Sequence, residues 1–412
     1  MAKNIIIGQS GGPTAVINSS LAGVYKAARS LGADKVYGMK YGIEGLLKEE
    51  LLELNVLLDD RMSIELLKRT PSSYLGSCRF KLPDPDTDAT PFVKLFTLFD
   101  KYDICAVFYI GGNDSMDTIA KLSRYGQQVG SNVRFIGVPK TIDNDLFGTD
   151  HCPGFASAAK YIATSCMEVS KDCRVYDTGT ITVMEIMGRH AGWLAGSAAL
   201  ATYAGAGPDL VYLPEVPFRM EEFWQDVDRI YRQNGSCMVA VSEGVQYADG
   251  RFVAESGDRD VFGHTQLGGL GAMLAESVKR QTGAKVRSIE LSLLQRCASH
   301  VASKTDIDEA YMAGKAAVEA AVSGQTDKMV AFERITENGI YSCKTKLIGL
   351  GEVANVEKLV PREWINARGN GVEQPFIDYV LPLIQGETAM QKEYSLPRFA
   401  KLRKVPAKPK QR

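Results

Sequence analysis

An α/β fold with mostly parallel sheets is predicted by three features of this sequence. Short runs rich in β-branched and aromatic residues alternate with segments of helical periodicity. The chain has 412 residues, more than one hydrophobic core usually organises, so two domains are expected. The apolar fraction of 45% and the charged fraction of 24% are those of a folded globular protein.

The expected strands and helices follow one another in the order of βαβ units. A strand over residues 4–8 precedes a helix over 15–29, and a strand over 106–112 precedes a helix over 115–126. Further strands are expected over 134–138, 180–186, 210–213 and 237–243. Because parallel strands need crossover connections that cover the sheet, this order favours parallel sheets with helices on both faces.

Charge, cysteines and hydropathy exclude several classes of function. The formal net charge is −1, from 48 basic and 49 acidic residues, so no overall field attracts nucleic acid or membranes. The eight cysteines are scattered without a C-x-x-C pair, which disfavours a zinc site and a disulfide framework. No apolar run approaches the roughly 20 residues that span a bilayer, and no signal peptide is evident. We therefore expect a cytoplasmic protein that binds neither nucleic acid nor membranes.

Glycines and polar residues follow the first two strands, at the strand ends where parallel sheets bind ligands. The segment GQSGGPTAVIN (8–18) opens a helix, and its backbone N–H groups suit a phosphate, although a plain tight turn explains it equally well. The segment GGNDS (111–115) places Asn113 and Asp114 at a helix start. Their oxygens suit Mg²⁺ that bridges phosphates; capping of the helix is the alternative.

The segment PKTIDNDLFGTD (139–150) is the densest concentration of reactive side chains. Asp143 is suited to accept a proton from a sugar hydroxyl, and Lys140 is suited to neutralise charge on a transferring phosphoryl group. A solvated acidic turn is the alternative. After another expected strand, Arg189 is suited to hold a phosphate bidentately, whereas His190 is expected to make a structural hydrogen bond.

Taken together and in this order, these segments resemble the phosphofructokinase family. The resemblance is carried by Gly11, LGSCRF (75–80), GGNDS, PKTIDND, MGR, SEG (242–244) and LLQR (293–296), of which PKTIDND is highly specific. It implies two Rossmann-like domains with the active site in the cleft between them. The implied division is 1–154 plus 295–345 on the side of the phosphoryl donor, and 155–294 plus 346–412 on the side of the sugar phosphate.

The resemblance also implies a reaction, a metal and a set of residues. The reaction is reversible, Mg²⁺-dependent transfer of a phosphoryl group from pyrophosphate to the 1-hydroxyl of fructose 6-phosphate, a glycolytic step, by a homodimer or homotetramer. The implied catalytic residues are Asp143 as proton acceptor with Lys140, Asp114 and Thr141, and the metal-site residues are Asn113 and Asp145. The implied substrate-binding residues are Gly11, Arg79, Thr141, Ile142, Asp143, Met187, Gly188, Arg189, Glu243, Leu293, Leu294, Gln295 and Arg296, with Arg287 lent by a neighbouring subunit.

Two residues favour the pyrophosphate-dependent branch of the family. ATP-dependent relatives have glycine at the positions of Asp114 and Lys140, which leaves space for the α-phosphate of the nucleotide. A carboxylate about 4 Å from a phosphate repels it by roughly 4 kcal/mol at an effective dielectric constant near 20, about a thousandfold against ATP. Lys140 is then expected to steady the leaving group and the transferring phosphoryl group.

Three positions depart from the family pattern. Asn113 replaces the usual aspartate on the metal side, and Leu293 and Thr180 replace polar residues near the sugar phosphate. Sedoheptulose 7-phosphate is therefore an expected further substrate.

An ATP-dependent phosphofructokinase and a non-catalytic sugar-phosphate sensor are the alternatives. The intact Asp143 and Thr141 argue against the sensor.

Overall fold

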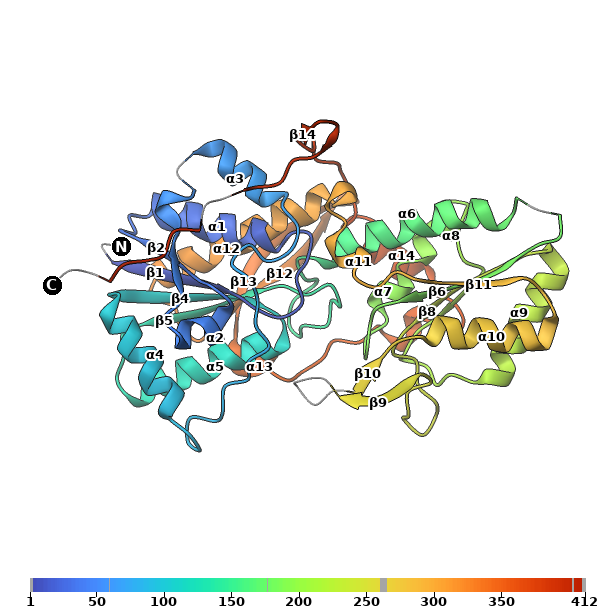
Figure 1. The fold of residues 1–412 in the computed structure, drawn as a ribbon, viewed down its shortest axis with the longest axis horizontal. Helices are drawn as coiled ribbons and strands as arrows, with labels where there is room; N and C mark the ends of the chain where they lie inside the picture. The colour runs from blue at the N-terminus through green and yellow to red at the C-terminus, as the bar shows by residue number, and fades with distance from the viewer. Residues whose placement is uncertain (1–2, 59, 176, 260–264, 402–403, 410–412) are drawn as a thin grey trace.

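The protein is described by a computed structural model that covers residues 3–58, 60–175, 177–259, 265–401 and 404–409. A seven-stranded sheet and a four-stranded sheet, each with its helices, lie side by side along the long axis (Figure 1). The predicted α/β fold with mostly parallel sheets is confirmed. No helix in the described part of the chain is long and apolar enough to cross a membrane.

The seven-stranded sheet has the order β13-β12-β5-β4-β1-β2-β3. Its strands are β1 (Asn4–Gln9), β2 (Val36–Met39), β3 (Leu51–Glu53), β4 (Ile104–Gly111), β5 (Arg134–Pro139), β12 (Lys328–Glu337) and β13 (Ile340–Gly349). All neighbouring pairs are parallel except β2 with β3 and β12 with β13, so the two antiparallel strands lie at the edges. The chain leaves β1 and β4 toward opposite edges, which makes their boundary the switch point where such sheets bind ligands.

The four-stranded sheet has the order β11-β6-β8-β7 and is parallel throughout. Its strands are β6 (Ile181–Ile186), β7 (Leu210–Tyr212), β8 (Cys237–Ser242) and β11 (Val286–Glu290). Two short antiparallel hairpins stand apart from both sheets, formed by β9 (Glu255–Arg259) with β10 (Thr265–Leu267) and by β14 (Lys392–Glu393) with β15 (Leu396–Pro397). Every strand that we predicted is present.

Helices cover both faces of each sheet. Around the seven-stranded sheet they are α1 (Ile17–Ser30), α2 (Gly42–Leu47), α3 (Arg61–Lys68), α4 (Thr90–Lys101), α5 (Asn113–Gln128), α12 (Lys304–Val322) and α13 (Leu350–Val353). Around the four-stranded sheet they are α6 (Phe155–Cys173), α7 (Trp193–Gly196), α8 (Ala199–Tyr203), α9 (Met220–Asn234), α10 (Leu270–Thr282), α11 (Leu294–Cys297) and α14 (Gln374–Val380). Short 3₁₀ turns are η1 (Leu54–Val56), η2 (Ser299–Val301) and η3 (Arg362–Trp364).

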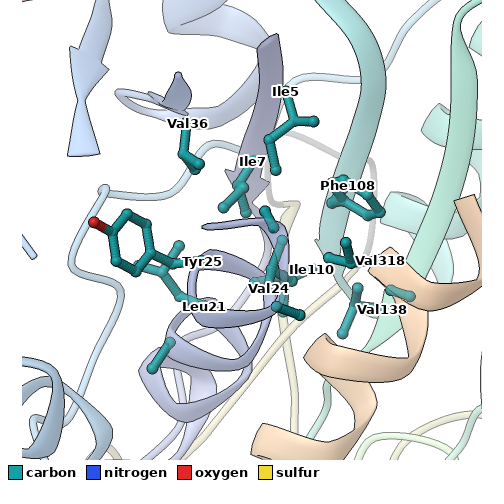
Figure 2. Close-up of a cluster of buried hydrophobic side chains, with 14 of the residues drawn as sticks. Ile5, Ile7, Leu21, Val24, Tyr25, Val36, Phe108, Ile110, Val138 and Val318 are labelled. Carbon is teal, nitrogen blue, oxygen red and sulfur yellow. The ribbon is translucent and has the colours of Figure 1, made fainter. Parts of the chain in front are cut away.

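Alternate residues of β1 enter different hydrophobic cores. Ile5 and Ile7 pack with Leu21 of α1 and Val318 of α12 (Figure 2), whereas Ile6 belongs to the core on the opposite face with residues of α2, α4 and α5. Because side chains of a strand point alternately to the two faces of a sheet, both faces must be covered. This burial explains why β1 is a continuous apolar run.

The hairpin of β12 and β13 was not predicted. Asn338 and Gly339, with φ of 53° and 75°, form its turn, and residues Lys328–Glu337 pair antiparallel with Ile340–Gly349. An Asn-Gly pair is a strong local signal for such a turn, because both positions need positive φ. The β13 strand alternates between partly buried and exposed residues, so it lacks the continuous apolar run of the central strands.

Both ends of the chain lie at the seven-stranded sheet: the N-terminal segment forms β1, and the C-terminal segment is hydrogen-bonded to β3. Val405 accepts a hydrogen bond from the N–H of Glu53, and Ala407 donates one to the carbonyl of Leu51, at 3.0 and 2.9 Å. The predicted division assigns 346–412 to the other domain, and these last contacts lie beside β3 instead. The boundaries of the two domains stay a prediction.

Candidate active site

One pocket of about 620 Å³ lies where the carboxyl ends of both sheets meet. Segments that follow β1, β4 and β5 line it with Gly11, Asp114 and Lys140. Segments that follow β6, β8 and β11 line it with Arg189, Glu243 and Arg296. Six strand ends, distant in the sequence, therefore contribute to a single site.

The glycine-rich segment after β1 leaves space for two cations. Gly11 has φ of +76°, and a Cβ atom there would lie 3.2 Å from Nζ of Lys140. A Cβ atom on Gly12 would lie 3.2 Å from Nη1 of Arg296. The helix α1 begins only at Ile17, so these glycines precede its first turn. The expected anion site therefore has cationic side chains beside the open backbone.

The capping alternative for Asp114 does not describe this structure. The helix α5 begins at Asn113, its N-cap is Gly112, and no side chain caps it. Asp114 lies in the first turn, is exposed and lines the pocket. Its carboxylate is thus available to a ligand and is favoured there by the helix dipole.

Asp143 lies in a setting suited to a general base. Its backbone N–H donates to Oγ1 of Thr141 at 3.1 Å, and that hydroxyl lies 3.5 Å from Oδ2 of Asp143. Burial first, and then the charges of Asp145 and Glu243, raise the pKa of Asp143 to about 7 against the opposing charge of Lys140. A carboxylate with a pKa near neutrality accepts a proton more readily than an ordinary aspartate.

Lys140 places an ammonium group at the glycine-rich segment. Lys140 is only 2% exposed, and its Nζ donates a hydrogen bond to the carbonyl of Gly12 at 2.7 Å. Burial lowers the pKa of Lys140 to about 8, while Asp143 and Asp145 act in the opposite direction. Lys140 and Asp114 line the same pocket, as the predicted shared role in selecting the donor requires.

Asn113 and Asp145 present oxygens that suit a cation. Nδ2 of Asn113 lies 3.4 Å from Oδ2 of Asp145, which aligns the two side chains. Oδ1 of each is buried and has no hydrogen-bond partner among the described residues. Burial, and then the charge of Glu357, raises the pKa of Asp145. Buried oxygens without a donor fit an oxygen-seeking ion such as Mg²⁺.

The segment after β6 is held by residues from two other strand ends. The N–H of Met187 donates to Oε1 of Gln295 at 3.3 Å, and the N–H of Gly188 donates to Oε1 of Glu243 at 3.4 Å. Gly188 has φ of +134°, which favours glycine. Burial raises the pKa of the Glu243 carboxyl group. This segment positions Met187 and Arg189 at the pocket.

Three arginines, Arg79, Arg189 and Arg296, line the pocket. Burial lowers the pKa of Arg296, and the nearby guanidinium of Arg79 lowers it further. Like charges that approach within one cavity are stabilised when an anion lies between them. The three arginines are therefore suited to bind phosphate groups.

Several predicted residues do not line this pocket. Arg287 lies on β11 with its side chain 48% exposed, and Nη1 contacts Oδ2 of Asp172 at 3.1 Å. Leu293 and Leu294 are 55% and 58% exposed. Gln295 is buried and reaches the site through its contact with Met187, whereas Ile142 lines the pocket directly.

Some lining residues were not predicted as site residues. His190, expected to be structural, lines the pocket, as do Asn355 and Glu357 from the segment after α13. Glu357 pairs with Leu146 in an isolated bridge, which brings this late segment to the loop after β5. No local sequence motif predicts this contact between Glu357 and Leu146, because the two residues are far apart in the chain.

Comparisons with known proteins show which proteins this chain is similar to. A family model described as phosphofructokinase matches residues 4–321. The chain is 44% identical to a pyrophosphate--fructose 6-phosphate 1-phosphotransferase of Halomonas elongata, over 97% of this chain and 96% of that one. A Methylococcus capsulatus protein of the same name is also 44% identical, over 94% and 92%. The crystal structure of a pyrophosphate-dependent phosphofructokinase from Nitrosospira multiformis is similar with a TM-score of 0.90 at 38% identity, and the match covers 100% of this chain and 99% of that one.

Proposed function

This chain belongs to the phosphofructokinase family, and we propose that it transfers a phosphoryl group reversibly from pyrophosphate to the 1-hydroxyl of fructose 6-phosphate. The products are fructose 1,6-bisphosphate and phosphate. The observation that carries the proposal is that Asp114, Lys140 and Asp143 line one pocket. The names of the similar proteins support the choice of donor and sugar.

Asp143 acts as the general base. The O1 oxygen of the sugar forms a bond to phosphorus while the bridging P–O bond of pyrophosphate breaks and phosphate leaves. The hydroxyl proton passes to the Asp143 carboxylate, whose raised pKa of about 7 suits this transfer at neutral pH. Thr141 holds the loop at Asp143 through the hydrogen bond that it accepts from the Asp143 N–H.

Lys140 stabilises the charge on the transferring phosphoryl group and on the leaving phosphate. Its buried ammonium lies beside the open backbone of Gly11 and Gly12, where little water screens it. Electrostatic groups that are already oriented in a site of low dielectric constant lower the barrier most effectively. Gly11 and Arg79 hold the donor with it.

Asp114 and Lys140 together select pyrophosphate. The Asp114 carboxylate repels the additional phosphate of a nucleotide, whereas Lys140 attracts the shorter donor. This pairing argues against the ATP-dependent alternative. The presence of the base beside them argues against a non-catalytic sensor.

Mg²⁺ is the cofactor that the site fits. Asn113 and Asp145 would hold it through the buried oxygens that lack a hydrogen-bond donor among the described residues. The bound ion supplies positive charge to the phosphate oxygens of the donor.

The sugar phosphate binds on the side of the four-stranded sheet. Arg189 and Arg296 pair with its phosphate, and Glu243 accepts hydrogen bonds from its hydroxyl groups. The exposed Arg287 serves the site of a neighbouring subunit in a homodimer or homotetramer. We place the enzyme in the cytoplasm.

Initial rates with each donor and each sugar test this proposal. Purified protein with Mg²⁺ is assayed with pyrophosphate or ATP, and with fructose 6-phosphate or sedoheptulose 7-phosphate. We expect turnover of fructose 6-phosphate with pyrophosphate and little with ATP. Robust turnover with ATP and none with pyrophosphate would refute the assignment of the donor.

A further inference from the structure

The loop that carries Asp143 and Asp145 is held by a tyrosine far along the chain. The hydroxyl of Tyr379, on α14, accepts a hydrogen bond from Nδ2 of Asn144 at 2.8 Å, across 235 positions of sequence. The same hydroxyl donates to the carbonyl of Asp150 at 2.6 Å. One buried oxygen thus joins both ends of the segment 144–150.

Asn144 is the residue through which this contact acts on the site. It lies between Asp143 and Asp145 and has φ of +57°, a left-handed conformation that asparagine adopts more readily than most residues. Its Oδ1 accepts a hydrogen bond from the N–H of Cys152 at 2.9 Å. Both ends of the amide are therefore occupied. Because the backbone turns at Asn144, its orientation sets the directions of the two neighbouring carboxylates.

Lys358 holds the same loop from a second direction. Its Nζ donates to the carbonyls of Asp150 and Thr149, at 2.6 and 3.3 Å. Its backbone N–H donates to the carbonyl of Asp145 at 2.8 Å. The Lys358 ammonium also lies 5.0 Å from the ring centroid of Trp193. Lys358 therefore contacts the backbone of this loop at Asp145 and at its end, residues 149 and 150.

Both residues connect the loop to the core of the four-stranded sheet. The ring of Tyr379 lies 5.1 Å from that of Trp193 and 5.5 Å from that of Trp364, measured between centroids. Trp193 is buried in that core, whereas the loop itself follows β5 of the other sheet. Tyr379 and Lys358 thus bridge the donor side and the sugar side of the pocket.

We propose that Tyr379 and Lys358 are positioning residues that hold Asp143 and Asp145 in the orientation required for phosphoryl transfer. The inference rests on the proposed function. Neither residue lines the pocket, so neither is expected to contact a substrate. Their loss is expected to lower kcat more than it raises KM, because small displacements of reacting groups reduce the rate strongly.

Tyr379→Phe tests the tyrosine. It removes both hydrogen bonds and keeps the ring against the two tryptophans. We expect kcat to fall about 10- to 100-fold, with KM for fructose 6-phosphate changed by less than about threefold. The matched control is Tyr231→Phe, which removes a hydroxyl that donates to the carbonyl of Thr178 at 3.3 Å, away from the pocket. Its kcat should equal that of the wild type.

A double-mutant cycle separates positioning from general destabilisation. Asn144→Ala, Tyr379→Phe and the double variant are assayed well below their melting temperatures. The effects on ln kcat should be clearly less than additive, because both single changes remove the same contact. Lys358→Met, which keeps an apolar stem over Trp193, should also lower kcat selectively, and Lys358→Arg, which keeps donors, should restore part of the rate.

Unchanged kcat in folded Tyr379→Phe, or additive effects in the cycle, would overturn the proposal. If Tyr379→Phe does not fold, wild-type kcat in Lys358→Met would overturn it equally. Failure of the proposed function has a different signature, because the wild-type protein would then not use pyrophosphate. If it used ATP instead, the same kcat ratios measured with ATP would still decide the role of Tyr379 and Lys358.

Discussion

The two sides of the pocket carry different kinds of polar group. On the side of the seven-stranded sheet, burial brings the pKa values of Asp143 and Lys140 to about 7 and about 8, closer to neutrality than their ordinary values. On the side of the four-stranded sheet, Arg189 and Glu243 line the pocket just after two strand ends. The Glu243 carboxylate accepts a hydrogen bond from the backbone N–H of Gly188 there. The first arrangement is suited to move protons and charge, and the second to hold a ligand.

From this difference we predict that one side performs the chemistry and the other provides recognition. Changes after β4 and β5 should then appear mainly in kcat or in the choice of donor. Changes after β6 and β8 should appear mainly in KM for the sugar phosphate. Steady-state kinetics of single variants can separate the two, because kcat and KM report different interactions.

The largest effect is expected for Asp143→Asn. An amide of the same shape cannot accept the hydroxyl proton, so kcat should fall by about 10² to 10⁴. Binding of fructose 6-phosphate, measured by calorimetry, should change by less than about threefold. Asp249→Asn, an exposed aspartate paired with Arg251, is the control. A kcat above about a tenth of the wild-type value would place the base elsewhere.

A change of donor preference is expected when Asp114 and Lys140 are both replaced by glycine. The rate with pyrophosphate should fall about 100-fold, since an oriented positive charge is lost. Some turnover with ATP should appear, because the repelling carboxylate is gone. The ratio of kcat/KM for the two donors measures this change. Unchanged kinetics with pyrophosphate would contradict both roles.

Arg189→Met should act on the other side of the pocket. Loss of a charged hydrogen-bonding partner of the sugar phosphate corresponds to about 1.5–3 kcal/mol, so KM for fructose 6-phosphate should rise by about 10- to 150-fold. The kcat should change much less. Arg174→Met is the control, since Arg174 pairs with Asp209 outside the pocket. A loss confined to kcat would show that recognition and chemistry are not divided between the sides.

The pH dependence should show the smallest effect, about tenfold per pH unit. Burial, then Asp145 and Glu243, raise the pKa of Asp143 to about 7, and the base works in its ionised form. Activity should therefore be present above about pH 7 and decline as the pH falls through this value. Measurement of kcat/KM between about pH 5.5 and 8.5 checks this predicted decline of activity. A constant kcat/KM down to the lower limit would mean that Asp143 does not control the rate.

The central strands could be predicted because buried strands consist of consecutive apolar residues, which are visible in the local sequence. The strands β1, β4 and β8 are buried along most or all of their length, so each appears as an apolar run that ends in polar or glycine residues. The motifs after β1, β4, β5 and β6 singled out Gly11, Asp114, Asp143 and Arg189, and all four line the pocket. The β12–β13 hairpin was missed although Asn338 and Gly339 signal its turn.

Contacts between segments that are distant in the chain could not be predicted from a local sequence pattern. The sequence contains Tyr379, Lys358 and Glu357, but nothing near them indicates that they meet a loop more than 200 positions earlier. Local residue order is sufficient for strands, turns and reactive motifs, since these depend on neighbours in the chain. The approach of α14 to the loop after β5 follows instead from the packing of two hydrophobic cores, and that packing sets the orientation of Asp143.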